Sequence, residues 1–153
     1  IVFGGLAGAL PPLLGWTSMT NSIGIEALIL VLIIFVWTPA HFWPLAIDRV
    51  NDYKKAKVPM LPVTHGIPHT KNCIIIYSLI LLLVSILPYL QGMSDKIYLM
   101  SAIILGGYFL FFTFTLKYVP NKNSAMKTFY ASIIYLFLLF MALMIDHAAS
   151  HYF

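Results

Sequence analysis

At residues 27–43 the chain reads ALILVLIIFVWTPAHFW, a run without any Asp, Glu, Lys or Arg. The hydrocarbon core of a bilayer is about 30 Å thick, and a helix needs about 20 apolar residues to cross it. A charge-free run of nearly this length that ends in aromatic side chains is typical of a membrane-spanning helix. We therefore predict that residues 27–43 cross a membrane.

Four other stretches have the same character. Residues 73–90, 97–116 and 128–145 also lack charged side chains, whereas residues 1–16 are apolar but short and contain Pro11-Pro12. We expect residues 1–16 to be the last part of a spanning helix that begins upstream, and the small residues Gly4, Gly5 and Gly8 would let a neighbouring helix approach closely. Of the 153 residues, 61% are apolar and only 9% are charged, against about 25% charged in soluble domains. The sequence predicts one domain, 1–153, that is an all-α polytopic membrane helix bundle of about five spans.

The basic residues lie on one side of this predicted bundle. Eight of the nine fall in two connections, residues 44–72 and 117–127, and only Lys96 falls on the other side. Positive charge is retained on the cytoplasmic side during insertion, so we expect the 44–72 loop to be cytoplasmic. The net charge of +4 then reflects this bias and the neighbouring membrane lipid, and it requires no nucleic-acid partner.

The long 44–72 loop carries the candidate chemistry. Asp48 and Asp52 are four residues apart, so both carboxylates would share one helix face if the helix persists to this point. Mg²⁺ prefers one or two carboxylates completed by substrate phosphate oxygens and water, and neighbouring cations could hold the remaining phosphate oxygens. The basic residues in question are Arg49, Lys54, Lys55 and Lys57. The alternative is an ordinary solvated loop, in which such charges form exposed ion pairs of little energetic weight.

Aromatic side chains gather at the same membrane border. Trp37, Phe42, Trp43 and Tyr53 could form an interfacial belt, or they could line the access route of an apolar substrate tail and stabilise a developing positive charge. Tyr53 could also orient a diphosphate through its hydroxyl group. Of the five histidines, His41 is the best candidate for a contact with haem, and the alternative is a hydrogen bond to the helix backbone.

Three motifs then carry a family resemblance. The segments GALPPLLGW at 8–16, WTPAHFWPLA at 37–46, and DY at 52–53 followed by VPMLPV at 58–63 are similar to the C-terminal half of the protohaem IX farnesyltransferases, or haem O synthases. This family belongs to the UbiA superfamily of intramembrane prenyltransferases. The segment 129–146 resembles the last helix of the family, so the resemblance covers nearly the whole chain.

The resemblance implies a nine-helix fold of which this chain supplies helices five to nine and the second of two acidic motifs. It implies that farnesyl diphosphate and haem B are the substrates and that Mg²⁺ is the cofactor. The reaction at the bacterial inner membrane would give haem O and diphosphate. Asp52, Asp48 and Tyr53 would belong to the catalytic site, with Asp48 and Asp52 as metal ligands. The first acidic motif would lie in a missing N-terminal half, so we expect these residues alone to be inactive.

Two other classes of protein are compatible with part of the pattern. Five spans and a long cytoplasmic loop would also suit half of a membrane transporter. Charge-free spans, and the lack of a predicted helix break beyond Pro11-Pro12, count against this alternative. A haem- or quinone-binding membrane subunit could use His41 as a ligand, but the sequence offers no second histidine at a similar depth on another span.

Overall fold

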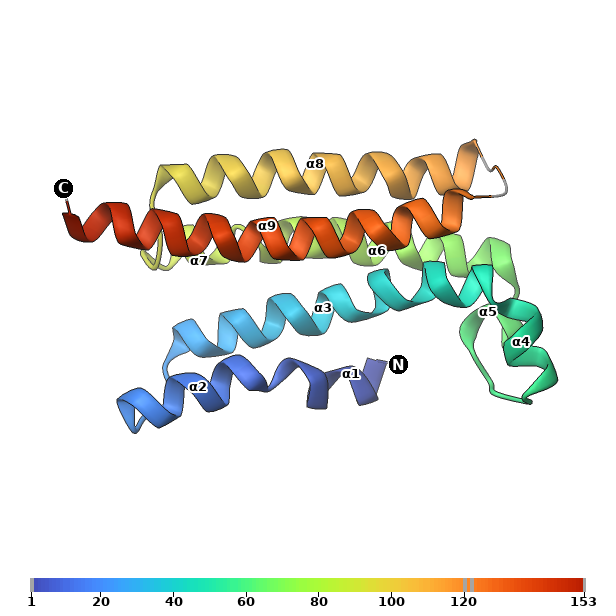
Figure 1. Ribbon diagram of the computed structural model, residues 1–153, viewed down its shortest axis with the longest axis horizontal. Helices are drawn as coiled ribbons and strands as arrows, with labels where there is room; N and C mark the ends of the chain where they lie inside the picture. The colour runs from blue at the N-terminus through green and yellow to red at the C-terminus, as the bar shows by residue number, and fades with distance from the viewer. Residues whose placement is uncertain (1, 120, 122, 153) are drawn as a thin grey trace.

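The computed structural model describes residues 2–119, 121 and 123–152, and within them all regular structure is helical. Figure 1 shows an elongated bundle in which long helices run side by side. The helices are, in order, α1 (Val2–Ala9), α2 (Pro11–Thr20), α3 (Ile25–Asp48), α4 (Val50–Lys55), α5 (Leu61–Thr64), α6 (Ile67–Val84), α7 (Leu87–Leu90), α8 (Lys96–Tyr118) and α9 (Ser124–Tyr152). The all-α prediction is confirmed.

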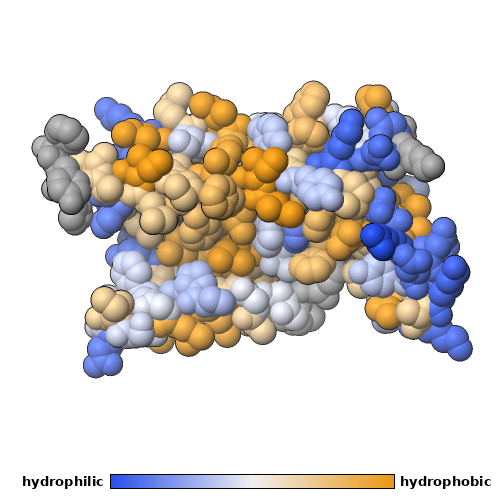
Figure 2. All heavy atoms as spheres, in the orientation of Figure 1, coloured by the Kyte–Doolittle hydropathy of each residue, from blue (hydrophilic) through white to orange (hydrophobic). Residues whose placement is uncertain are grey.

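Four helical segments in the described part of the chain are long and apolar enough to cross a bilayer. They are Ile25–Asp48, Ile67–Leu90, Lys96–Tyr118 and Ser124–Ala149. Each contains one of the four charge-free runs of the sequence, which confirms a multi-pass membrane protein. In Figure 1 the connection that holds α4 and α5 lies at the same end as the end of α8 and the start of α9. The two segments richest in Lys and Arg therefore lie at the same end of the bundle, and Figure 2 shows hydrophilic side chains gathered there.

The first predicted segment, 1–16, is divided into α1 and α2. The break falls at Leu10, directly before Pro11-Pro12, because proline lacks the N–H that would continue the α1 hydrogen bonds. Both short helices pack against α3 (Figure 1). At Gly5 an added Cβ would lie 2.9 Å from the Thr38 Cγ2 atom, so the expected close helix approach is confirmed at this glycine. That residues 1–16 end a spanning helix stays a prediction.

Two boundaries of the predicted loop 44–72 were wrong. Helix α3 continues past Pro44 to Asp48, and α6 already begins at Ile67. Proline is tolerated within a spanning helix because the surrounding bundle re-satisfies the freed carbonyl. Pro68 occupies the first turn of α6, where its missing N–H costs nothing. The connection between these spans is therefore shorter than predicted and contains α4 and α5.

The core of the bundle lies among α3, α6, α8 and α9 and includes a polar contact at a second helix break. The break separates α6 from α7 after Val84, although the sequence predicts none there. The Ser85 Oγ atom lies 2.6 Å from the Tyr135 hydroxyl of α9, and the Tyr98 hydroxyl of α8 donates to the Ser85 carbonyl at 2.9 Å. These bonds satisfy polar groups at the break and join three helices.

The start of α8 is capped by a carboxylate from another helix. Asp146, near the end of α9, accepts hydrogen bonds from the Asp95 and Tyr98 backbone N–H groups and is 1% exposed. The first N–H groups of a helix have no partner within it, and an anion there also favours the helix dipole. Asp146 thus fixes the end of α9 against the beginning of α8.

The first prediction concerns the close approach of α6 and α8. At Gly106 an added Cβ would overlap the Leu82 Cδ1 atom and lie 3.3 Å from its Cγ, whereas at Gly107 nothing lies within 4 Å. Gly106→Ala should lower the free energy of unfolding by about 1–3 kcal/mol, since Leu82 must leave its position. Gly107→Ala should raise it by about 0.5–1 kcal/mol, through the entropy of the unfolded chain. Thermal unfolding in detergent measures both, and equal melting temperatures would contradict this packing.

The second prediction concerns the cap on α8. Asp146→Ala removes the acceptor of two backbone N–H groups and should lower the free energy of unfolding by about 1–2 kcal/mol. The matched control is Asp95→Ala, because the Asp95 side chain makes no capping bond and the variant keeps its backbone N–H. The control should change stability by less than about 0.5 kcal/mol. Amide hydrogen exchange at residues 95 and 98 reports the cap directly, and unchanged protection in Asp146→Ala would disprove it.

Candidate active site at the charged end of the bundle

The two predicted acidic residues lie on either side of a helix break. Asp48 is the last residue of α3, Arg49 has φ −98° and ψ 22°, and Asp52 lies in the first turn of α4. The condition that one helix continues through both residues is therefore not met, so a shared helix face does not follow for these two carboxylates. Arg49 lies between them in the chain and is within ion-pair distance of each.

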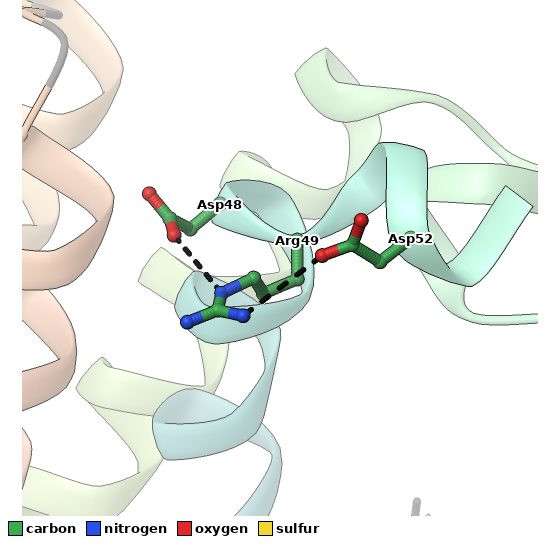
Figure 3. A network of polar contacts seen from close by, with 3 residues as sticks. All are labelled: Asp48, Arg49 and Asp52. Carbon is green, nitrogen blue, oxygen red and sulfur yellow. Dashed lines mark ion pairs between the residues drawn. The ribbon is translucent and has the colours of Figure 1, made fainter.

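Arg49 makes an ion pair with each acid. Its Nε atom is 3.6 Å from Asp48 Oδ2, and its Nη1 atom is 3.9 Å from Asp52 Oδ2. Figure 3 shows the guanidinium group with one carboxylate on either side. The Asp48 side chain is 28% exposed, against 66% for Asp52. Asp48 is thus the more sheltered of the two acids, and both already neighbour a positive charge.

The remaining predicted charges follow this triad of Asp48, Arg49 and Asp52 along the chain. Lys54 and Lys55 lie in the last turn of α4, and Lys57 follows in the left-handed backbone region with φ 54°. All three side chains are exposed, whereas Tyr53 is half-buried. The structure therefore brings the predicted acids and bases into one short segment at the charged end.

A buried histidine lies about two turns of α3 before Asp48. His41 is 8% exposed, and its ring is stacked between Trp37, with centroids 4.2 Å apart, and Phe129 of α9, at 4.5 Å. The His41 Nδ1 atom is 2.7 Å from Ser132 Oγ, and Trp37 Nε1 donates to the Ser132 carbonyl at 2.9 Å. Nδ1 of His41 thus bonds to a second helix, and not to the backbone of its own.

Sequence reasoning missed the part that Phe129 plays in this arrangement. Phe129 and Ser132 are three residues apart and so share a face of α9, but no spacing rule says that this face meets His41. Along α3, Trp37, His41 and Asp48 are separated by four and seven residues, which places them on one face. Trp37 and His41 of the aromatic stack, and Asp48 of the triad, therefore follow one another along the same side of α3.

Two cavities flank Trp37. The first, of about 420 Å³, is lined by α1 and α3 residues, including Gly4, Gly8 and Phe42. The second, of about 500 Å³, is open to the surface between α3 and α9, and apart from Trp37 its lining is aliphatic, aromatic or methionine. Trp43 lines neither, because it is 6% exposed and packs edge-on against Tyr77 in the core. Of the predicted aromatic set, Trp37 and Phe42 line a cavity and Trp43 packs between helices.

Known proteins resemble this chain along most of its length. The model of the UbiA prenyltransferase family matches residues 1–146. This chain belongs to that family. It is 56% identical over 147 residues to a protein named protoheme IX farnesyltransferase 2 from Pseudoalteromonas atlantica, and 56% identical over 147 residues to a protoheme IX farnesyltransferase from Alcanivorax borkumensis. Each alignment covers 96% of this chain and 48% of the relative.

A third relative, a protein named protoheme IX farnesyltransferase 2 from Vibrio campbellii, is 52% identical over 153 residues, which are 100% of this chain and 50% of that protein. The chain thus spans about half the length of the curated relatives it matches. No solved structure matches it. The resemblance found in the three sequence motifs is confirmed.

UbiA prenyltransferases generally use Mg²⁺ to bind a diphosphate, and the two acids of the triad are the candidate ligands in this member. No group of three or more His, Cys, Asp or Glu side chains within metal-binding distance occurs in the described chain. Mg²⁺ nevertheless commonly takes only one or two carboxylates and completes its shell with substrate phosphate and water. Asp48 and Asp52 are carboxylates of this kind, so they are the residues that could hold a Mg²⁺ ion which arrives with a diphosphate.

The third prediction follows from the position of Arg49 between the two acids. If Asp48 and Asp52 bind a divalent cation, Arg49 competes with that cation for the same carboxylates, so Arg49→Gln should raise the affinity for Mn²⁺ without diphosphate by about threefold, as expected for exposed ion pairs. Mn²⁺ accepts the same oxygen ligands as Mg²⁺ and can be titrated by electron paramagnetic resonance. Lys54→Gln is the matched control, because it removes the same charge from a residue outside the triad. Equal affinities of the two variants would show that Arg49 does not neutralise the acids.

Proposed function

We propose that this chain forms part of a bacterial inner-membrane enzyme that transfers the farnesyl group of farnesyl diphosphate to haem B, giving haem O and diphosphate. Its membership of the UbiA family and the names of its relatives support this proposal. The observation that carries it is that Asp48, His41 and Trp37 lie along one side of α3: the charged triad is followed by the aromatic stack, and Trp37 of that stack lines both apolar cavities. Such a gradient suits a substrate with an anionic head and a long apolar tail.

The charged end would bind the diphosphate. Asp48 and Asp52 would hold Mg²⁺, and Arg49, Lys54, Lys55 and Lys57 would bind phosphate oxygens that the ion leaves free. When bound, Mg²⁺ stabilises the negative charge that develops on the leaving diphosphate. Because Arg49 pairs with both acids, it would move from the carboxylates to the phosphate when substrate binds. The half-buried Tyr53, next to Asp52 in the chain, would donate a hydrogen bond from its hydroxyl group to the diphosphate.

The apolar cavities would receive the farnesyl chain. The cavity between α3 and α9 offers about 500 Å³, which lies within the usual range of ligand pockets. Trp37 belongs to both cavities and also stacks on His41. An allylic cation formed at the head of the chain would meet the faces of aromatic rings, which attract positive charge, in a region poor in water.

The haem would lie against the same stack. His41 would contact the haem, with Phe42, 41% exposed, beside it. The other half of the site would come from the part of the protein that the relatives have in addition to the matched region. The two alternatives, half of a membrane transporter and a haem- or quinone-binding membrane subunit, are not favoured by the relatives, which are named as farnesyltransferases.

The fourth prediction tests the acidic motif in the intact protein. Asp52→Ala should lower the rate of haem O formation by about a hundredfold or more, because preorganised charge at the leaving group is usually the largest catalytic contribution. Glu26→Gln is the matched control, since Glu26 lies in the first turn of α3, at the opposite end of the bundle's central span. Haem O extracted from membranes is quantified by chromatography and mass spectrometry. Full activity of Asp52→Ala beside an active control would remove the metal-site part of the proposal.

A further inference from the structure

The hydrogen bonds of Ser132 determine which nitrogen of His41 carries the proton. The Ser132 Oγ atom lies 2.6 Å from the Phe129 carbonyl oxygen and 2.7 Å from His41 Nδ1. Both distances are those of hydrogen bonds, and each such bond needs a hydrogen between its two atoms. A carbonyl oxygen can only accept, and a serine hydroxyl has a single hydrogen to donate.

The Ser132 hydrogen must therefore point to the Phe129 carbonyl. The hydrogen in the other contact then belongs to His41, so Nδ1–H donates to Ser132 Oγ. His41 is only 8% exposed, and taking a charged imidazolium ring out of water is costly, so the ring is neutral. In a neutral imidazole with a proton on Nδ1, the other nitrogen, Nε2, carries a free electron pair.

We propose that Ser132 is a positioning residue that locks His41 in the Nδ1–H form and thereby presents Nε2 as an electron-pair donor to the reacting haem. The haem substrate in this inference rests on the proposed function, whereas the tautomer of His41 rests only on the hydrogen bonds of Ser132. Trp37 and Phe129 hold the ring plane, and the Trp37 Nε1 bond to the Ser132 carbonyl fixes α9 against α3. In proteins generally, a hydrogen bond to one ring nitrogen of a histidine fixes the ring orientation and the tautomer, and so determines the basicity of the other nitrogen.

An Nε2 electron pair can serve the reaction in two ways that share this chemistry. It can bind the haem iron, or it can accept a proton from the water that forms the hydroxyl group of the product. In the second case the water oxygen forms a bond to the carbocation carbon left by attack of the vinyl group on farnesyl, and the released proton goes to Nε2. The Nδ1–H bond to Ser132 is retained in both cases.

The tautomer can be measured without any substrate. In the intact protein, labelled with ¹⁵N-histidine in lipid nanodiscs and with the His41 signals assigned by comparison with His41→Ala, we expect Nδ1 to be proton-bearing and Nε2 to be unprotonated. Ser132→Ala should produce a mixture of tautomers and lower kcat by about 10–100-fold, and Ser132→Thr should restore both. Ser78→Ala is the matched control, because this buried serine bonds to a carbonyl of its own helix.

The two roles of Nε2 are separated by the optical spectrum of bound haem. If Nε2 binds iron, His41→Ala shifts the Soret band; if Nε2 accepts a proton, the band stays in place while kcat falls and KM for haem is retained. A proton on Nε2 in the wild-type protein would overturn the proposal, as would a Ser132→Ala variant with unchanged tautomer and kcat. Absence of farnesyl transfer by the wild-type protein would instead disprove the proposed function, and the tautomer measurement would be unaffected.

Discussion

A polar group inside a bilayer has no water to bond to, and this constraint underlies how the helices of this protein meet. Several contacts between the helices join a polar side chain to a partner on another helix. Trp37 bonds to Ser132 across α3 and α9, Ser85 at the end of α6 bonds to Tyr135 of α9, and Asp146 caps α8. Because lipid is as apolar as the core side chains, hydrophobic burial alone would not select one pairing of these helices.

The same constraint shapes the site. The charged triad of Asp48, Arg49 and Asp52 lies at the end of α3, where water is available, and its acids pair with an arginine between them. Farther from this end of α3, the His41 Nδ1 atom forms a hydrogen bond with Ser132 Oγ, and aromatic rings cover both faces of the imidazole. The charged triad and the aromatic stack are therefore separated along α3. The charges lie where the helix end is accessible to water, and the aromatic rings lie where it is not.

Much of this could be predicted from the residues alone. Runs without charge locate spans because a charged side chain in hydrocarbon is costly, and the distribution of lysine and arginine identifies the charged end. The kinds of charged side chain in residues 48–57 could also be predicted, since two carboxylates four residues apart beside basic residues are visible in the sequence. The break at Arg49 was not, because no proline or glycine marks it. The place of Trp43 was also hidden, since an aromatic ring near a helix end can face the core or a cavity.

By itself, then, the sequence determined an all-α membrane protein with four clear spans, a charged end and the acids and aromatic residues of the site. Only the tertiary structure decided that Arg49 pairs with both acids, that Phe129 and Ser132 contact His41, and that Asp146 caps the start of α8. The physical reason is that hydropathy and charge act residue by residue, so they can be read along the chain. A hydrogen bond or a ring stack depends on the rotation of one helix against another, and that rotation is set by the packing of the whole bundle.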